Sequence, residues 1–222
     1  MINLKRILAV VVLVFTFTTT HAQQLFSFST DFGVQRNFKK EQRFWVVGST
    51  SQALFHITAK NGVYVSFGIY VPGKFKNNLV ATAKDISTSP QEVSYINTGK
   101  MRLKQLSIGW RHYFKGAPDA EQGWNLYGFA GFGALLGRIE NKHSVSLDTA
   151  VYNVPVRMGK ANFKRLTFDL GAGWEIPVGA DFYFFAEGKV WIPTTDYPSK
   201  YIFVNSNAPL TAFGSIGLRI LF

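Results

Sequence analysis

Apolar and polar residues alternate along most of the chain, and the alternation is strictest in its last segment, residues 210–222 (LTAFGSIGLRILF). One set of alternate positions is apolar throughout and ends at Phe222, whereas the other set carries small and charged groups, including Arg219. Successive side chains of a β-strand point to opposite faces. The segment is therefore predicted to be a strand with one face suited to lipid and one that tolerates charge.

The same period of two predicts seven further strands. Their approximate ranges are 25–35, 44–59, 63–71, 105–114, 124–138, 165–176 and 181–192. Tight connections are expected at Lys60-Asn61-Gly62, because Asn-Gly favours a hairpin turn, and at 177–180. Longer connections are expected at 72–99, 139–162 and 193–209. Short and long connections thus alternate along the chain.

Eight strands and alternating connections predict an all-β fold, an eight-stranded antiparallel up-and-down transmembrane β-barrel. Such barrels have short periplasmic turns and long extracellular loops, which would place both termini in the periplasm. After Gln23 no apolar run is long enough for a transmembrane helix. A soluble barrel with an internal ligand is the alternative. We favour the membrane barrel because small and charged residues, such as Gly109 and Arg111, share the face opposite the bulky apolar ones.

The first 22 residues have the layout of a secretory signal. A basic start (Lys5, Arg6) precedes an apolar run over 7–17 and a polar end at Ala22. We expect cleavage after Ala22 and a barrel domain over 23–222; the run is too short for the alternative, a spanning anchor. The chain carries 24 Lys and Arg against 13 Asp and Glu, and it has no cysteine, which excludes disulfides and thiol chemistry.

With its signal, its alternating strands and its final aromatic residue, the chain resembles small bacterial outer-membrane β-barrel proteins. It is similar to the outer-membrane β-barrel family that includes PorT-like proteins and, more loosely, to OmpX/OmpA-type barrels. Leu218, Ile220 and Phe222 resemble the C-terminal assembly signal of that class. The resemblance implies a bacterial outer-membrane location, contact with outer-membrane lipid, and recognition by the outer-membrane insertion machinery during assembly. It implies little about activity.

Charged residues of both signs fall on the face predicted to point inward. They are Asp31, Arg111, Arg165, Asp169, Glu175, Glu187, Lys189 and Arg219. Buried charges persist when they are paired and hydrogen-bonded, so we expect a lumenal salt-bridge network. A narrow ion path or proton relay is the alternative, but an eight-stranded barrel has room only for the side chains that fill it.

Basic residues dominate the side of the long connections. The set comprises Arg36, Lys39, Lys40, Arg43, Lys74, Lys76, Lys142, Arg157 and Lys160. On the outer side of the membrane such cations would meet the phosphates of lipopolysaccharide. The alternatives are an uncommitted solvated surface or a protein partner. Nucleic acid is not expected as a partner, because the location is wrong for it.

No catalytic, cofactor or metal site is expected. His56, His112 and His143 do not match the His-x-Ser pattern of lipid A deacylases, and neither a glycine-rich phosphate loop nor a metal-ligand spacing is present in the sequence. Aromatic residues near strand ends are interpreted as interfacial girdles. These are Trp45, Trp110, Tyr113, Phe114, Trp124, Trp174, Trp191 and Tyr197. The favoured function is a non-enzymatic structural or interaction role, and the alternative is an accessory component of a secretion or outer-membrane assembly system.

Overall fold

The computed structural model describes residues 26–38, 40–179, 181–194, 200–202 and 210–222, so the predicted signal segment, Lys39 and Tyr197 lie outside the described residues. Its strands are β1 (Phe26–Asn37), β2 (Trp45–Thr58), β3 (Asn61–Tyr70), β4 (Gly73–Ala83), β5 (Glu92–Lys115), β6 (Asn125–His143), β7 (Tyr152–Asn153), β8 (Gly159–Gly179), β9 (Phe182–Pro193) and β10 (Thr211–Leu221). A 3-10 turn, η1 (Lys40–Gln42), follows β1. Among these residues no helix is long and apolar enough to cross a membrane.

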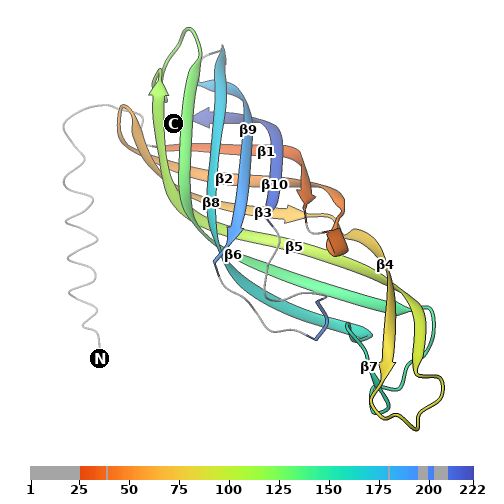
Figure 1. Cartoon of the computed structure of the whole chain (residues 1–222). Helices are drawn as coiled ribbons and strands as arrows, with labels where there is room; N and C mark the ends of the chain where they lie inside the picture. The colour runs from red at the N-terminus through yellow and green to blue at the C-terminus, as the bar shows by residue number, and fades with distance from the viewer. Residues whose placement is uncertain (1–25, 39, 180, 195–199, 203–209) are drawn as a thin grey trace, which may run out of the picture.

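Eight of the strands close into a ring (Figure 1). The hydrogen-bonded order is β1-β2-β3-β5-β6-β8-β9-β10, every pairing is antiparallel, and β10 returns to β1 from Ser27↔Leu221 to Asn37↔Thr211. Closure leaves the ring without an open edge. The predicted eight-stranded antiparallel up-and-down barrel is confirmed.

One end of the ring carries the tight turns. Thr58 and Asn61 pair across the β2–β3 turn, and Gly179 pairs with Phe182 across the β8–β9 turn. β1 begins and β10 ends at the same end of the barrel, where the Phe222 amide donates to the Phe26 carbonyl oxygen at 2.9 Å. The ring of Phe26 lies 5.2 Å from that of Phe55 and 5.9 Å from that of Phe222, centroid to centroid. The Phe26 ring therefore packs both against β2 and against the residue that follows β10.

The other end extends into an arm that the sequence pattern did not predict. β4 pairs with residues 92–101 of β5, and these residues continue beyond the part of β5 that pairs with β3. β6 and β8 also run past the ring, and β7 pairs with the end of β4. We call this extension the arm (lower right in Figure 1). The expectation that 72–99 and 139–162 are long loops is wrong, since much of both segments is strand.

A small hydrophobic cluster explains why these polar segments form strands. Leu79, Ala81, Tyr95 and Val156 are buried together in the arm. The opposite face of its strands is exposed and rich in lysine, so the average composition of the segment is polar although its alternation persists. The high average polarity of these segments led to the loop prediction, although their apolar and polar residues alternate as in a strand.

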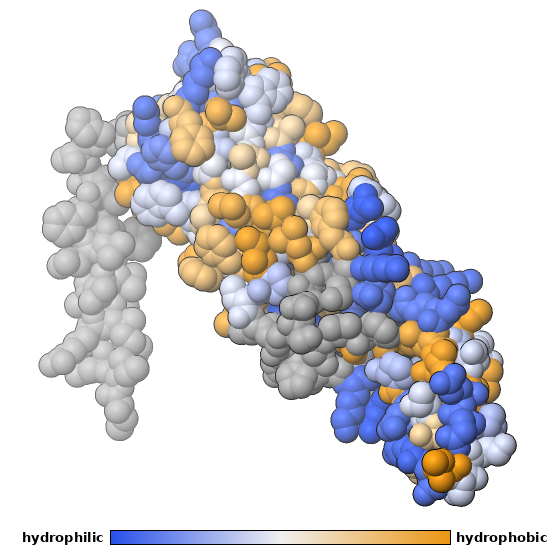
Figure 2. Space-filling model, in the orientation of Figure 1, coloured by the Kyte–Doolittle hydropathy of each residue, from blue (hydrophilic) through white to orange (hydrophobic). Residues whose placement is uncertain are grey.

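The outer wall of the ring is apolar and exposed. Large hydrophobic side chains project from all eight of its strands, among them Phe28, Phe32, Val47, Phe55, Val65, Phe67, Ile69, Leu106, Ile108, Phe132, Leu166, Leu170, Phe182, Ile192, Ile216 and Leu218. On the face seen in Figure 2, hydrophobic side chains gather over the ring and hydrophilic ones gather where the arm leaves it. We call this wall the apolar belt.

The interior holds aromatic side chains as well as the expected small and charged ones. Tyr64 is buried, and it pairs in register with Gly109, which pairs with Gly131. A Cβ atom at either glycine would lie 2.6 Å from the Tyr64 hydroxyl oxygen. The two glycines therefore leave the space that the tyrosine occupies, as aromatic side chains do over glycines in curved sheets.

This packing predicts opposite outcomes for two glycine substitutions. Gly131→Ala would place a methyl group against Tyr64 and the Ile108 carbonyl oxygen and should destabilise the barrel by about 1–3 kcal/mol. Gly188→Ala is the matched control, because a Cβ there meets no atom within 4 Å. Urea unfolding of both variants in detergent micelles measures the difference. Equal midpoints would contradict the assigned packing.

Candidate functional site

A salt bridge occupies the interior near the end with tight turns. The Arg219 guanidinium on β10 donates to both carboxylate oxygens of Glu175 on β8, at 2.9 and 3.1 Å. It also donates to the Pro118 carbonyl oxygen at 2.7 Å, and Asn125 donates to Glu175 at 2.9 Å. Arg219 is 1% and Glu175 0% exposed. This bidentate pair connects strands on different parts of the ring and satisfies both charges internally.

A second pair lies in the middle of the interior. Arg111 on β5 donates to the Glu187 carboxylate at 3.2 Å and to the Gln52 amide oxygen at 2.6 Å. The guanidinium carbon lies 4.0 Å from the centre of the Tyr127 ring, and the Tyr127 hydroxyl donates to Glu187 at 3.2 Å. The pair thus joins β2, β5, β6 and β9 across the barrel.

The two remaining acids on the inner face are held by hydroxyl and amide donors. Asp169 accepts from Thr167 at 2.7 Å and from Gln105 at 3.1 Å, and it also accepts from the Ser107 hydroxyl. Asp31 accepts from the Thr50 amide at 2.6 Å and from the Ser215 hydroxyl at 3.0 Å. Both acids thus have hydroxyl or amide donors from the barrel itself.

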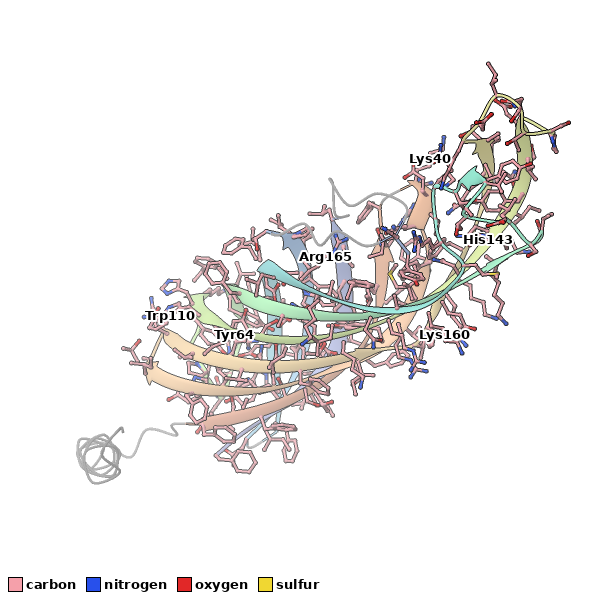
Figure 3. The ribbon with its side chains drawn as sticks, turned by 90° about the horizontal axis from the view of Figure 1, so that it is seen from below. Lys40, Tyr64, Trp110, His143, Lys160 and Arg165 are labelled. Atoms are coloured by element: carbon pink, nitrogen blue, oxygen red, sulfur yellow. The ribbon has the colours of Figure 1, made fainter. Side chains whose placement is uncertain are left out.

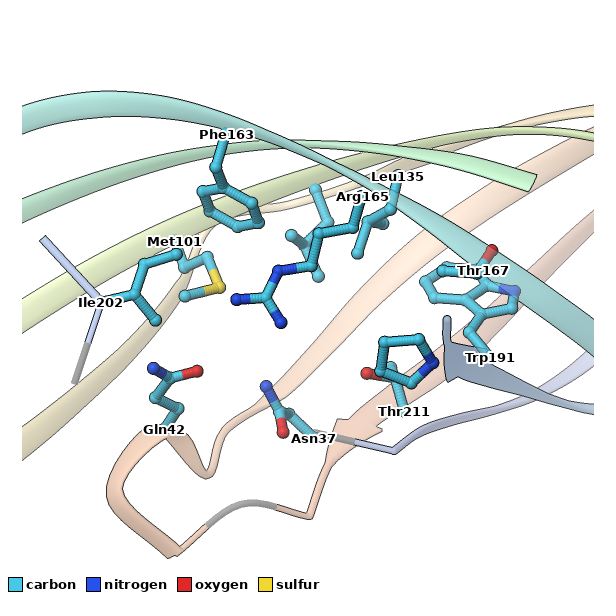
Figure 4. Close-up of a pocket in the computed structure, with 12 residues that line it drawn as sticks. Asn37, Gln42, Met101, Leu135, Phe163, Arg165, Thr167, Trp191, Ile202 and Thr211 are labelled. Atoms are coloured by element: carbon cyan, nitrogen blue, oxygen red, sulfur yellow. The ribbon is translucent and has the colours of Figure 1, made fainter. Parts of the chain in front are cut away.

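Arg165 and Lys189 lie toward the arm end of the interior. The Lys189 ammonium donates to the Thr50 hydroxyl at 3.1 Å. The Arg165 side chain, which is buried, points into a chamber lined by Met101, Phe163 and Trp191, with the amides of Gln42 and Asn37 facing it (Figure 4). The chamber is covered by Ile202 on the side of the arm. Apolar packing therefore closes the interior at this end.

The structure brings the predicted inward charges together in the barrel interior, as two ion pairs and two hydrogen-bonded carboxylates, with Arg165 and Lys189 toward the arm. Toward the arm, a hydrophobic cluster that includes Tyr70, Met101, Phe163, Trp191 and Phe213 packs in the interior. Described side chains thus line the barrel along its length and leave hollows of about 420 Å³ beside Arg165 and about 300 Å³ beside Tyr64 and Asp169.

The predicted basic residues lie mostly on strands and not on loops. Arg36 is the next-to-last residue of β1, and its guanidinium carbon lies 4.7 Å from the Trp45 ring centre. Lys40 is in η1, and Arg43 follows η1. Lys74 and Lys76 are on β4, Lys142 is on β6, and Lys160 is on β8 where the arm leaves the ring (Figure 3). Arg157 precedes β8 and is exposed.

The strands of the arm add four cations that the loop interpretation left out, and Lys100, which it counted with the loop 72–99, lies with them on a strand. Lys100, Arg102, Lys104, Arg138 and Lys164 are exposed and share the face of Lys74, Lys76, Lys142 and Lys160. We call these nine residues the cationic face. Glu140 lies among them, with its carboxylate oxygen 3.8 Å from the Lys142 and 3.7 Å from the Lys160 ammonium. The alternation of exposed and buried residues continues beyond the predicted strands, over 92–104 and 139–143, and this continuation could have identified the cationic face from the sequence.

Among the described residues, no histidine lies in a Ser-His-acid arrangement. His56 lies 3.0 Å from the Ser27 hydroxyl, a pairing that the sequence analysis missed, but Ser27 is 1% and His56 6% exposed. The other ring nitrogen of His56 is buried without a partner, so no carboxylate orients the ring. Burial in the arm lowers the pKa of His143, whose ring lies 4.6 Å from that of Tyr95. Across the described residues, no group of three His, Asp or Glu side chains could hold a metal ion.

Two aromatic residues assigned to the interfacial girdle are inside the barrel instead. Tyr113 is 0% and Trp191 2% exposed. Both occupy positions of the inward register, and the Tyr113 ring lies 5.5 Å from that of Tyr127. Trp45, Trp110, Phe114, Trp124 and Trp174 are exposed on the outer surface. Strand register, and not residue type, therefore decides whether an aromatic side chain points into the barrel or outward.

Breaking the Arg219–Glu175 pair should be costly. Arg219→Met leaves a buried, uncompensated carboxylate, so we expect the free energy of unfolding in micelles to fall by about 3–5 kcal/mol. Adding Glu175→Gln should recover part of the loss while keeping an acceptor for Asn125. Lys142→Met, which removes an exposed pair, should change it by less than about 1 kcal/mol. Similar losses for Arg219→Met and Lys142→Met would count against the lumenal pair.

The filled interior predicts that the barrel does not conduct ions. Reconstituted into planar lipid bilayers, it should give no stable single-channel steps, because side chains close both the middle of the barrel and its arm end. Reproducible steps of constant amplitude from the purified protein would refute this. A known porin in the same bilayers is the positive control.

No family model matches the chain, and no curated protein sequence matches it. Among solved structures, its fold is similar to that of Neisserial surface protein A (NspA), with a TM-score of 0.58 and 11% identity over 91% of this chain and 100% of that one. It is also similar to Ail, the attachment invasion locus protein of Yersinia pestis, with a TM-score of 0.50 and 11% identity over 90% of this chain and 100% of Ail. At this identity the likeness concerns the fold, a small closed antiparallel β-barrel.

Proposed function

We propose that this protein is an integral outer-membrane barrel that is not an enzyme, and that its cationic face contacts lipopolysaccharide. The observation that carries the proposal is the apolar belt around a closed ring, directly next to a dense group of cations. Soluble monomers rarely expose continuous apolar surface beyond a few hundred Å². A closed barrel with such a wall satisfies its backbone internally and can face lipid.

The orientation follows from the two ends of the barrel. Short turns lie on the periplasmic side of outer-membrane barrels, and longer connections lie outside. The end with tight turns, which includes Phe26 and Phe222, is therefore assigned to the periplasm and the arm to the exterior. Leu218 and Phe222 face outward at the closing strand, where the insertion machinery could contact them as an assembly signal. The predicted signal peptide and the description of Ail as an outer membrane protein agree with this location.

Charge favours lipopolysaccharide as the contact on the outer side. The cationic face holds nine Lys and Arg residues on neighbouring strands, and Glu140 is the acid among them. Phosphate groups accept charge-assisted hydrogen bonds from such side chains. The same positions lie immediately beyond the apolar belt, where the headgroups of a lipid leaflet begin. The four interior carboxylates already have donors within the barrel, so we assign the interaction to the surface and not to the lumen.

A second candidate role is that of an accessory component in a secretion or assembly system, as the PorT-like resemblance suggests. The end of the arm supports it, because Ile86 is 94% exposed and Val145 and Val151 are also exposed there. Lys84 donates to the Val151 carbonyl oxygen at 2.9 Å, so the connections that carry Ile86 and Val151 lie side by side. Exposed apolar residues on a projecting element suit a protein contact.

Crosslinking distinguishes the two roles. Co-purification from crosslinked outer membranes should recover lipopolysaccharide with the wild-type barrel and no stoichiometric protein. A protein partner that is lost on Ile86→Ser and Val151→Ser, but retained on Val80→Ser at another exposed position of the arm, would favour the accessory role instead.

Lipopolysaccharide retention should depend on the cationic face. Replacing Lys74, Lys76, Lys142 and Lys160 with Ser should weaken retention by at least about tenfold, since each cation near an anionic surface contributes about 1 kcal/mol. Replacing Lys60 and Lys115, which lie at the end with tight turns, is the control and should change little. Binding to lipopolysaccharide micelles at two salt concentrations measures both. Equal retention by all three proteins would remove the basis of the proposal.

A further inference from the structure

Like charges face each other across neighbouring strands of the cationic face. Arg102 on β5 is directly opposite Arg138 on β6, and Lys100 on β5 is directly opposite Lys74 on β4. Side chains directly opposite each other in an antiparallel pair have Cβ atoms about 4.5–5.5 Å apart, and like charges at that separation destabilise the sheet. Two such pairs in adjacent rows are therefore costly unless an anion lies between them.

Among the described residues, Glu140 is the acid at this surface, and its carboxylate is paired with Lys142 and Lys160 and not with the arginines. The ion pairs of the described residues connect Arg111 with Glu187, Arg219 with Glu175, and Glu140 with Lys142 and Lys160. Glu140 is opposite Lys100 in register, yet its carboxylate oxygen lies near Lys142 and Lys160. Among the described residues, no carboxylate oxygen lies within ion-pair distance of Arg102, Arg138 or Lys100, although Glu140 is the neighbour of Lys100 across the strands.

A hollow lies between these side chains. Pro72, Lys100, Arg102, Arg138 and Glu140 line about 550 Å³ of empty space that is open to solvent. Pro72 lies between the end of β3 at Tyr70 and the start of β4 at Gly73. The hollow lies at this gap, where β5 passes from pairing with β3 to pairing with β4. Two planar guanidinium groups and an ammonium group around one space form a donor set that matches the oxygens of a phosphate group.

The apolar belt continues directly below the hollow. On β5 the next outward residues after Arg102 are Lys104, Leu106 and Ile108, and on β6 Leu136 precedes Arg138 on the same face. Two residues of a strand span about 6.6–6.8 Å. An amphiphile whose phosphate lies in the hollow can therefore lay an acyl chain along Leu136, Leu106 and Ile108. This continuity selects a lipid over a free phosphate ion.

We propose that Arg102, Arg138 and Lys100 form a specific site for the phosphate group of an outer-leaflet lipid. The inference rests on the proposed function, because it requires the belt to lie in the membrane and the arm to lie outside. The site gives the proposed contact between the cationic face and lipopolysaccharide a defined position and a defined ligand group, a phosphate. The ligand neutralises the opposed arginines, so binding and stability of the arm are coupled.

The test compares two lipids and three proteins. Full-length barrel in detergent micelles is titrated with diphosphorylated lipid A and with the same lipid after enzymatic removal of its phosphates, and binding is followed by native mass spectrometry. We expect Arg102→Gln with Arg138→Gln to weaken binding of the phosphorylated lipid about tenfold or more and to leave the dephosphorylated lipid unaffected. Lys60→Gln with Lys115→Gln, which removes two cations at the opposite end, should match the wild type.

A stability measurement separates loss of the site from loss of the fold. Without lipid, the Arg102→Gln, Arg138→Gln variant should unfold at a urea concentration equal to or above that of the wild type, because charge repulsion has been removed. Phosphorylated lipid A should raise the wild-type midpoint and leave that of the variant nearly unchanged, since a ligand stabilises the state that binds it. Equal lipid-induced shifts, or an equal loss of both lipids, would overturn the site.

The site and the proposed function fail in different ways. If the wild type binds lipopolysaccharide, and the Lys74, Lys76, Lys142 and Lys160 variant loses it while the arginine variant retains phosphorylated lipid A, the specific site is wrong and the general contact stands. If the wild type binds neither lipopolysaccharide nor lipid A above its binding of the dephosphorylated lipid, both are wrong.

Discussion

Every backbone amide and carbonyl group in a sheet that faces hydrocarbon needs a partner within the sheet, and the pairing of β1 with β10 meets that requirement here. The 11 residue pairs from Ser27↔Leu221 to Asn37↔Thr211 turn an open sheet into a ring. Closure also fixes which side chains share the interior, because a one-residue slip in register would exchange inside and outside. The exposed wall, the filled lumen and the placement of the cations all depend on it.

The interior shows how a narrow barrel accommodates charge. Arg219 with Glu175 and Arg111 with Glu187 are paired, while Asp169 is held by hydroxyl and amide donors. Breaking such pairs is more costly than their net contribution to stability, because a lone buried charge is so unfavourable. The network connects six strands of the ring across the lumen. The cations outside the belt are exposed, and it is for this surface that the contact with lipopolysaccharide is proposed.

Much of the architecture was predictable because alternation is a local property. The eight strands of the ring and the inward positions of Asp31 and Arg219 follow from a period of two. The arm was missed because segments 72–99 and 139–162 are polar on average, and their strands are stabilised by partners distant in the sequence, such as Tyr95 and Val156. Tyr113 and Trp191 were misplaced for a related reason, since residue type was weighed above register.

The sequence by itself determined the class of fold, the two faces of each strand and the excess of positive charge, because these depend on residue order alone. Only the tertiary structure decided which charges meet, because pairing across strands depends on register. It placed Glu187 with Arg111, and it placed Arg102 opposite Arg138 although 36 positions separate them in the chain. The proposed phosphate site on neighbouring strands cannot be read from the linear pattern, since its residues become neighbours only when the sheet forms.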